Sequence, residues 1–264
     1  MNTLNYKRLS QNKQRGVSLI ELMVALVIVS FLIVAMVVIF LSGRASFLGQ
    51  EQLGRLQENG RYAFNLMTKE IQRAGYRTVV WEPPRLGFAF TNNSVDGTGS
   101  GSDVIELQYE FDKDCFGAYN TATVPVTLPD GTIVNVPRFD QRLISFGVVN
   151  NQLIYNCSYG PVNGALAVQI NSAVADGVEN LQIQYGEDLT NDLSVNRWVN
   201  AGGWNNLFDV VAVRIAMAVR TPEQIRLDAD TRTLDLYGLT TAAAGDQRIR
   251  RVYSGQVSIR NLTL

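Results

Sequence analysis

The side chains that most often carry out chemistry are scarce in this sequence. Histidine is absent from its 264 residues, and histidine is the commonest general base near neutral pH and the commonest metal ligand. The sequence also lacks a Gly-rich phosphate loop, a G-x-S-x-G elbow and a Cys-x-x-Cys pair, which are frequent marks of phosphate, acyl-transfer and redox sites. We therefore expect no catalytic residue, no cofactor and no enzymatic activity.

One cluster of oxygen-bearing side chains is a weak candidate for a metal site. Glu187, Asp188, Asn191 and Asp192 lie close together in the sequence, and carboxylate and amide oxygens are the ligands that calcium prefers. A hydrated turn is the alternative interpretation of such a cluster. We expect no other metal site.

Two cysteines, Cys115 and Cys157, can form one disulfide. They lie in the part of the chain that we place outside the cytoplasm below, where thiols oxidise. A bridge between them would stabilise the folded state by about 4 kcal/mol in the loop-entropy treatment. Two unrelated buried thiols are the alternative.

The overall charge does not indicate a nucleic-acid partner. The chain carries 23 basic and 24 acidic residues, whereas nucleic-acid binding requires a basic patch with interleaved aromatic residues. Arg248, Arg250 and Arg251 form the nearest candidate patch. We interpret them as the solvated start of a strand and expect no nucleic-acid partner.

The N-terminal region has the composition of a membrane-inserted segment. Residues 1 to 16 contain four basic residues, Lys7, Arg8, Lys13 and Arg15, and no acidic residue. The run from Leu22 to Leu41 is interrupted only by Ser30, and a helix of that length spans about 30 Å, the thickness of the hydrocarbon core of a bilayer. The positive-inside rule places the N-terminus in the cytoplasm and the residues after Arg44 across the membrane.

An acidic residue at the start of the apolar run needs an explanation. A charge inside such a segment costs about 2.5 to 3.5 kcal/mol at a helix centre and less near an end, and Glu21 directly precedes Leu22. A secretory signal peptide fits poorly because no A-x-A cleavage pattern closes the run. A plain signal anchor remains possible, but it gives no reason for Glu21.

Residues 15–26, RGVSLIELMVAL, resemble the signature of type IV prepilins. The resemblance implies that a prepilin peptidase of the inner membrane cuts between Gly16 and Val17 and methylates Val17. It also implies that Glu21 pairs with the N-terminal amine of a neighbouring subunit. Two differences from the family are Val17 in place of the usual phenylalanine and the absence of any proline before Pro83.

The apolar run continues as an amphipathic pattern. The residues Leu53, Leu56, Gly60, Ala63, Met67, Ile71 and Ala74 recur at spacings of three and four, which is one face of a helix. We predict a single helix from Val17 to Ala74, roughly 90 Å long at about 1.5 Å per residue, with Gly75 as its stop. The predicted regions are a leader (1–16), a membrane and assembly helix (17–43), its amphipathic continuation (44–75) and a head (76–264).

From about Trp81 the pattern becomes that of strands. Alternating or hairpin-flanking residues predict strands at Ile105–Phe111, Val124–Leu128, Thr132–Val136, Ser145–Val149, Gln152–Asn156, Leu181–Tyr185, Val211–Val219 and around Val257 and Ile259. We therefore predict an α+β protein with the type IV pilin fold, in which an antiparallel sheet packs against the outer half of the helix. Two long loops are predicted at Thr91–Ser102 and Glu187–Asn206.

Three head segments, residues 178–185, 210–220 and 251–261, are similar to those of PilW-like minor pilins. The resemblance implies a minor pilin that takes part in initiating pili near the fibre tip. Its implied partners are other minor pilins, the major pilin, the prepilin peptidase, the assembly platform and the inner membrane. The chain would cross that membrane once, with a periplasmic head, and reach the surface pilus after assembly. A J-type minor pseudopilin of type II secretion and a signal-anchored extracytoplasmic enzyme or binding protein are the alternatives.

Overall fold

A computed structural model describes residues 16–77, 89–97, 101–137, 140–161, 164–226, 228–242 and 245–261. The predicted leader up to Arg15 lies outside these residues, and so does Trp81, near which the strand pattern was predicted to begin. The chain divides into two compact units, Met1–Gly49 and Gln50–Leu264.

Helix α1 extends from Leu19 to Arg73, close to the predicted bounds. Its sequence contains no proline, so every residue after the first turn can donate its backbone hydrogen bond. The helix ends before Gly75, which adopts a φ of +75°, a conformation that glycine reaches without steric cost. The side-chain amide of Asn261 donates to the carbonyl of Gln72 at 3.1 Å and so caps the last turn.

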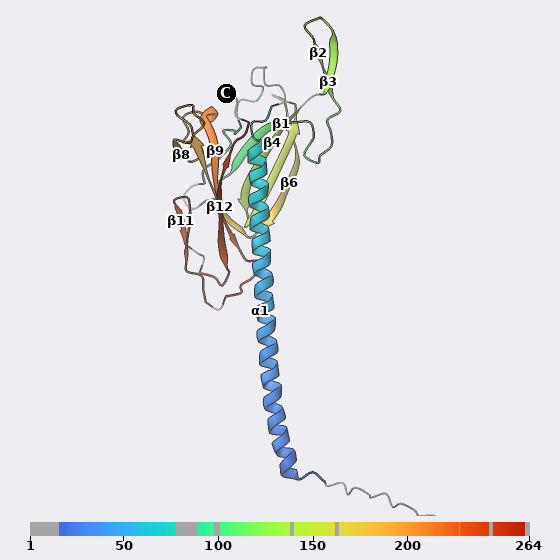
Figure 1. Ribbon diagram of the computed structural model, residues 1–264, viewed down its shortest axis with the longest axis vertical. Helices are drawn as coiled ribbons and strands as arrows, with labels where there is room; N and C mark the ends of the chain where they lie inside the picture. Colours follow the sequence, from blue (N-terminus) through green and yellow to red (C-terminus); the bar gives the residue numbers. More distant parts are fainter. Residues whose placement is uncertain are drawn as a thin grey trace, which may run out of the picture. The chain divides into compact units, whose positions relative to one another are not determined.

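The head contains two four-stranded antiparallel sheets, which Figure 1 shows beside the outer part of α1, residues 50–73. The first sheet has the order β1-β4-β5-β6, with bounds Ile105–Phe111, Asp140–Val149, Gln152–Gly160 and Ala167–Asp176. The second has the order β12-β9-β7-β8, with bounds Arg250–Ser258, Val210–Arg220, Val178–Glu187 and Arg197–Val199. The prediction of an antiparallel head is confirmed, but its strands form two sheets.

Two separate hairpins and one short helix complete the described elements. The hairpins are β2–β3 (Thr123–Thr127 and Ile133–Pro137) and β10–β11 (Thr233–Leu236 and Leu239–Ala242). A 3-10 helix, η1 (Leu207–Asp209), leads into β9. The first hairpin agrees with the prediction, whereas β6, β8, β10 and β11 were not predicted.

The inner faces of the sheets and one face of the outer part of α1 enclose a single core. Leu56, Ala63, Met67 and Ile71 on the helix are fully buried in it, which is the predicted face. Gln52 and Glu70 are also buried, although neither belongs to the predicted apolar face. Glu70 is satisfied in the core because the Tyr109 hydroxyl donates to it at 2.6 Å.

Close packing between α1 and β12 depends on two glycines. A Cβ atom at Gly60 would lie 2.2 Å from the ring of Tyr253, and one at Gly255 would lie 2.7 Å from the ring of Phe64. Each glycine therefore receives an aromatic ring from the opposite element. The Tyr253 hydroxyl also donates to the carbonyl of Leu56 at 3.4 Å.

Candidate functional site

The N-terminal part of α1 exposes a continuous apolar surface. Every residue from Leu22 to Leu41 is exposed, and the most apolar window of α1 has a mean hydropathy of 3.4. Among the described residues, α1 is the one helix long and apolar enough to cross a membrane. The Ser30 hydroxyl donates to the Val27 carbonyl at 2.7 Å, so the single polar residue in the run satisfies its own donor.

The predicted processing residues lie at the start of this surface. Gly16 and Val17 precede the first helical residue, Leu19, and Glu21 lies in the first turn. A carboxylate in a first turn interacts favourably with the helix dipole, and the Glu21 side chain is exposed. Cleavage between Gly16 and Val17, methylation of Val17 and pairing by Glu21 stay predictions.

A disulfide joins Cys115 to Cys157, with a Cα–Cα distance of 5.9 Å. It ties the segment after β1 to the middle of β5, and Cys157 is fully buried. The same segment is held from β4 because Arg142 donates to the carbonyls of Lys113 and Asp114.

The oxygen-rich cluster is engaged by groups of its own loop. The Glu187 carboxylate accepts hydrogen bonds from the Arg197 side chain and the Asn205 amide, each at 2.5 Å. Asp188 accepts from the amides of Thr190 and Leu193, and the backbone hydrogen bonds that it accepts lower its pKa against the opposing effect of desolvation.

The other two members of the cluster, Asp192 and Asn191, also take part in the turn. Asp192 accepts from Ser194, and Asn191 adopts a φ of 57° at the turn. The described part of the chain contains no group of three or more His, Cys, Asp or Glu residues arranged to hold a metal ion. The arrangement is that of a hydrogen-bonded turn.

The predicted loop Glu187–Asn206 is more structured than expected. Residues 197–199 form β8, which pairs with the end of β7. Trp204 packs edge-on against the buried Tyr185 ring, with centroids 5.0 Å apart, and the guanidinium of Arg214 lies 3.8 Å from the centroid of Trp198. The prediction missed these contacts because they join residues that are close only after the strands pair.

The prediction that Arg248, Arg250 and Arg251 form the solvated start of a strand is wrong for Arg250, although Arg251 is exposed and β12 does begin here. Arg250 is 2% exposed and forms ion pairs of 2.7 Å with Glu179 and 2.6 Å with Asp246. Arg248 donates to the carbonyl of Thr221 at 2.8 Å. The correction has a physical reason, since a buried guanidinium is stable only when carboxylates from other elements surround it.

A buried carboxyl group organises the segment before β1. Asp103 is 2% exposed and accepts hydrogen bonds from the amides of Gly97 at 2.8 Å and Ile183 at 2.7 Å. The pKa of Asp103 is raised to about 6, mainly by burial and also by the nearby Asp96, while the hydrogen bonds from the two amides oppose the change. This group therefore changes its charge in a mildly acidic range.

Comparisons with known proteins agree with the fold and the N-terminal motif. Residues 155–261 match the family described as Type IV Pilus-assembly protein W, and residues 11–41 match the prokaryotic N-terminal methylation motif. The structure is similar to that of a type IV-like pilin from Thermus thermophilus, with a TM-score of 0.52 and 17% sequence identity, covering 80% of this chain and 98% of that one. Comparison with curated proteins gives no match.

Proposed function

We propose that this chain, a type IV pilin-like protein with a PilW domain and a prepilin methylation motif, is a minor pilin that helps to initiate pili near the fibre tip. The observation that carries the proposal is the arrangement of α1. An exposed apolar stretch lies within the residues that match the methylation motif, and the outer part of the same helix is buried in the core of the head. Such a helix can be held in a membrane and later packed against the helices of other subunits.

The proposal assigns a role to each predicted processing residue. A prepilin peptidase removes residues 1–16 by cutting after Gly16, and Val17 becomes the methylated N-terminus. Glu21 then lies at the fifth position of the mature chain and pairs with the amine of a neighbouring subunit. Because an ion pair in a low-dielectric fibre core is geometrically demanding, it specifies register more than it adds stability.

The proposed location is the inner membrane, with the N-terminus in the cytoplasm and the head in the periplasm before assembly. Membrane anchoring by the apolar helix and the Cys115–Cys157 bridge support this topology, because disulfides persist in the periplasm. The proposed partners are other minor pilins, the major pilin, the peptidase and the assembly platform. The match to a pilus-assembly family favours the pilus over type II secretion.

Intact-mass spectrometry of the purified chain tests the proposal. Cells that contain the peptidase should yield a mature chain that begins at N-methylated Val17, whereas Gly16→Val should leave residues 1–16 attached because a branched side chain occupies the cleavage position. Co-purification from the membrane should recover other pilins with the mature chain. An uncleaved wild-type chain, or recovery with secretion-system components alone, would contradict the assignment.

A further inference from the structure

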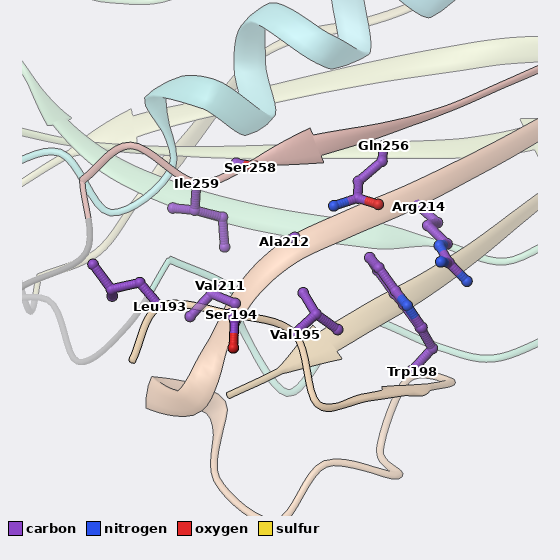
Figure 2. Close-up of a pocket in the computed structure, with 10 residues that line it drawn as sticks. All are labelled: Leu193, Ser194, Val195, Trp198, Val211, Ala212, Arg214, Gln256, Ser258 and Ile259. Carbon is purple, nitrogen blue, oxygen red and sulfur yellow. The ribbon is translucent and has the colours of Figure 1, made fainter. Parts of the chain in front are cut away.

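The outer face of the second sheet contains a groove that the assembly role does not explain. In β9, Val213 and Ile215 face the core, so the alternating residues Ala212, Arg214 and Ala216 face outward. The β10–β11 hairpin covers Ala216 through Leu236. The groove lies farther along the same face and is drawn in Figure 2.

Small residues form the floor of the groove. Ala212 is paired in register with Gly186 on β7 and with Ser258 on β12. A Cβ atom at Gly186 would lie 3.0 Å from the ring of Trp198 and 2.8 Å from Val195. The missing side chain at Gly186 therefore allows both of these residues to lie over β7 and to form a wall.

One end of the groove presents a positively charged group, the guanidinium of Arg214. The Arg214 guanidinium lies 3.8 Å from the centroid of Trp198 and 5.8 Å from that of Tyr237. Arg214 is the one charged residue in the lining, and it forms no ion pair with any carboxylate of the described residues. Stacking orients the guanidinium plane and leaves its N–H donors available at the edge.

The opposite end of the groove is apolar. Figure 2 shows Leu193, Val211 and Ile259 at the end away from Arg214, with Ala212 between the two ends. Leu193 is 53% exposed, whereas Val211 and Ile259 are only 7% and 6% exposed, so Leu193 is the apolar side chain available for contact at this end. Neutral hydrogen-bonding groups of Gln256, Ser194 and Ser258 lie along the groove.

We propose that this groove binds the carboxyl terminus of a polypeptide whose last residue is apolar. A planar guanidinium matches a carboxylate in a bidentate arrangement, and a single cation balances the single charge of a chain terminus. The apolar end receives the last side chain, while the amide of Gln256 and the serine hydroxyls can bond to the last peptide group. An acidic sugar fits less well, because it would place polar hydroxyl groups against the exposed apolar side chain of Leu193.

Peptide binding to the purified full-length chain in detergent tests this proposal. The probe is a fluorescein-labelled Gly-Ser-Gly-Ser-Gly-Leu peptide with a free carboxyl terminus, measured by fluorescence anisotropy. We expect it to bind at least about tenfold more tightly than the same peptide with a terminal amide or with a terminal serine. Arg214→Gln should remove the preference for the free acid, whereas Arg251→Gln, an exposed cation on β12, should not change it.

A second variant tests the site without removing Arg214. Ala212→Leu places a large side chain on the floor and should reduce binding by a similar factor, while circular dichroism and the melting temperature confirm that each variant is folded. Equal binding of acid and amide, or unchanged binding in both variants, would overturn the proposal. Tighter Arg214-dependent binding of an oligogalacturonate than of the peptide would also overturn it, in favour of an acidic sugar.

Discussion

The buried carboxyl of Asp103 couples the stability of the head to pH. Its two backbone hydrogen bonds connect the segment at Gly97 to β7 at Ile183, so its charge affects two separate elements. Since the pKa in the folded state is about 6 and the ordinary value is 3.8, the folded state holds this proton more strongly than the unfolded state does. The resulting stabilisation is present below about pH 4 and is lost as the pH rises through about 6.

Replacing Asp103 by Asn should therefore remove one pH-dependent contribution to the free energy of unfolding. Between pH 4 and pH 7 the free energy of unfolding of the wild type should fall by at most about 3 kcal/mol relative to that of Asp103→Asn, since one pKa unit corresponds to about 1.4 kcal/mol. Urea unfolding of both chains at several pH values measures this difference. Asp96→Asn removes the neighbouring negative charge and should therefore shift this loss of stability to lower pH. If the free energies of unfolding of wild type and Asp103→Asn change in parallel with pH, the coupling is disproved.

At the scale of elements, the packing of α1 against β12 requires a glycine at the position of the helix that faces Tyr253. Gly60→Ala should lower the free energy of unfolding by about 1 to 3 kcal/mol, the usual range for overpacking, because its Cβ would lie 2.2 Å from the Tyr253 ring. Gly54→Ala is the matched control, since no atom lies within 4 Å of its Cβ, and it should be neutral or stabilising by up to about 1 kcal/mol. Urea unfolding followed by circular dichroism compares the two, and equal effects would show that the ring moves aside freely.

The disulfide should contribute strongly to the stability of the head. The bridged cysteines are 42 residues apart, and closure of a loop of that size stabilises the folded state by about 4 kcal/mol when it restricts the unfolded chain. Addition of a reductant should therefore shift the urea midpoint of the wild type downward. The double variant Cys115→Ala, Cys157→Ala should show no response to the reductant, and alkylation of both thiols without prior reduction would contradict the bridge.

The sequence predicted the elements whose faces differ most in polarity. Helix α1, β1 and β9 have regular apolar periodicity, because one face of each is buried in the core. Strand β6 lacks this signal because most of its residues are exposed, and β10 and β11 are only four residues long each. Short or edge strands depend on pairing with a neighbour, which local periodicity does not reveal.

The candidate sites were predictable to different degrees for the same reason. Gly16 and Glu21 belong to one short motif, so the sequence alone suggests them as candidate processing and assembly residues. The groove at Arg214 could not be predicted, because Trp198 reaches it only through the pairing of β8 with β7 and of β7 with β9. The absence of a side chain at Gly186 is informative only once its neighbour across the strand is known.

At the scale of the whole molecule, the proposed function implies a particular position of the subunit in a fibre. A subunit at the extreme tip has no neighbour ahead of it whose N-terminal amine needs a countercharge, yet this chain retains Glu21. The head includes a hairpin, β2–β3, that stands away from the two four-stranded sheets (Figure 1). Such a protrusion would be difficult to repeat along a tightly packed shaft. We therefore propose that the subunit lies just below the tip, in a small priming complex of minor pilins.

This placement predicts a specific defect for Glu21→Ala. Membrane insertion and head folding should remain intact, because Glu21 lies in the first turn of α1 and the head core involves α1 only from Gln52 onward. Recruitment into the complex should fall several-fold, and surface piliation should fall with it, since the neighbouring amine would lose its countercharge in a low-dielectric environment. Co-purification of other minor pilins and counts of surface pili measure the two effects. Glu51→Ala is the matched control, because Glu51 is an acidic residue of the same helix whose ion pair is local, with Arg55 at 2.7 Å. Normal complex recovery and normal piliation in the Glu21→Ala strain would show that the carboxylate has no assembly role, and the placement below the tip would then lose its support.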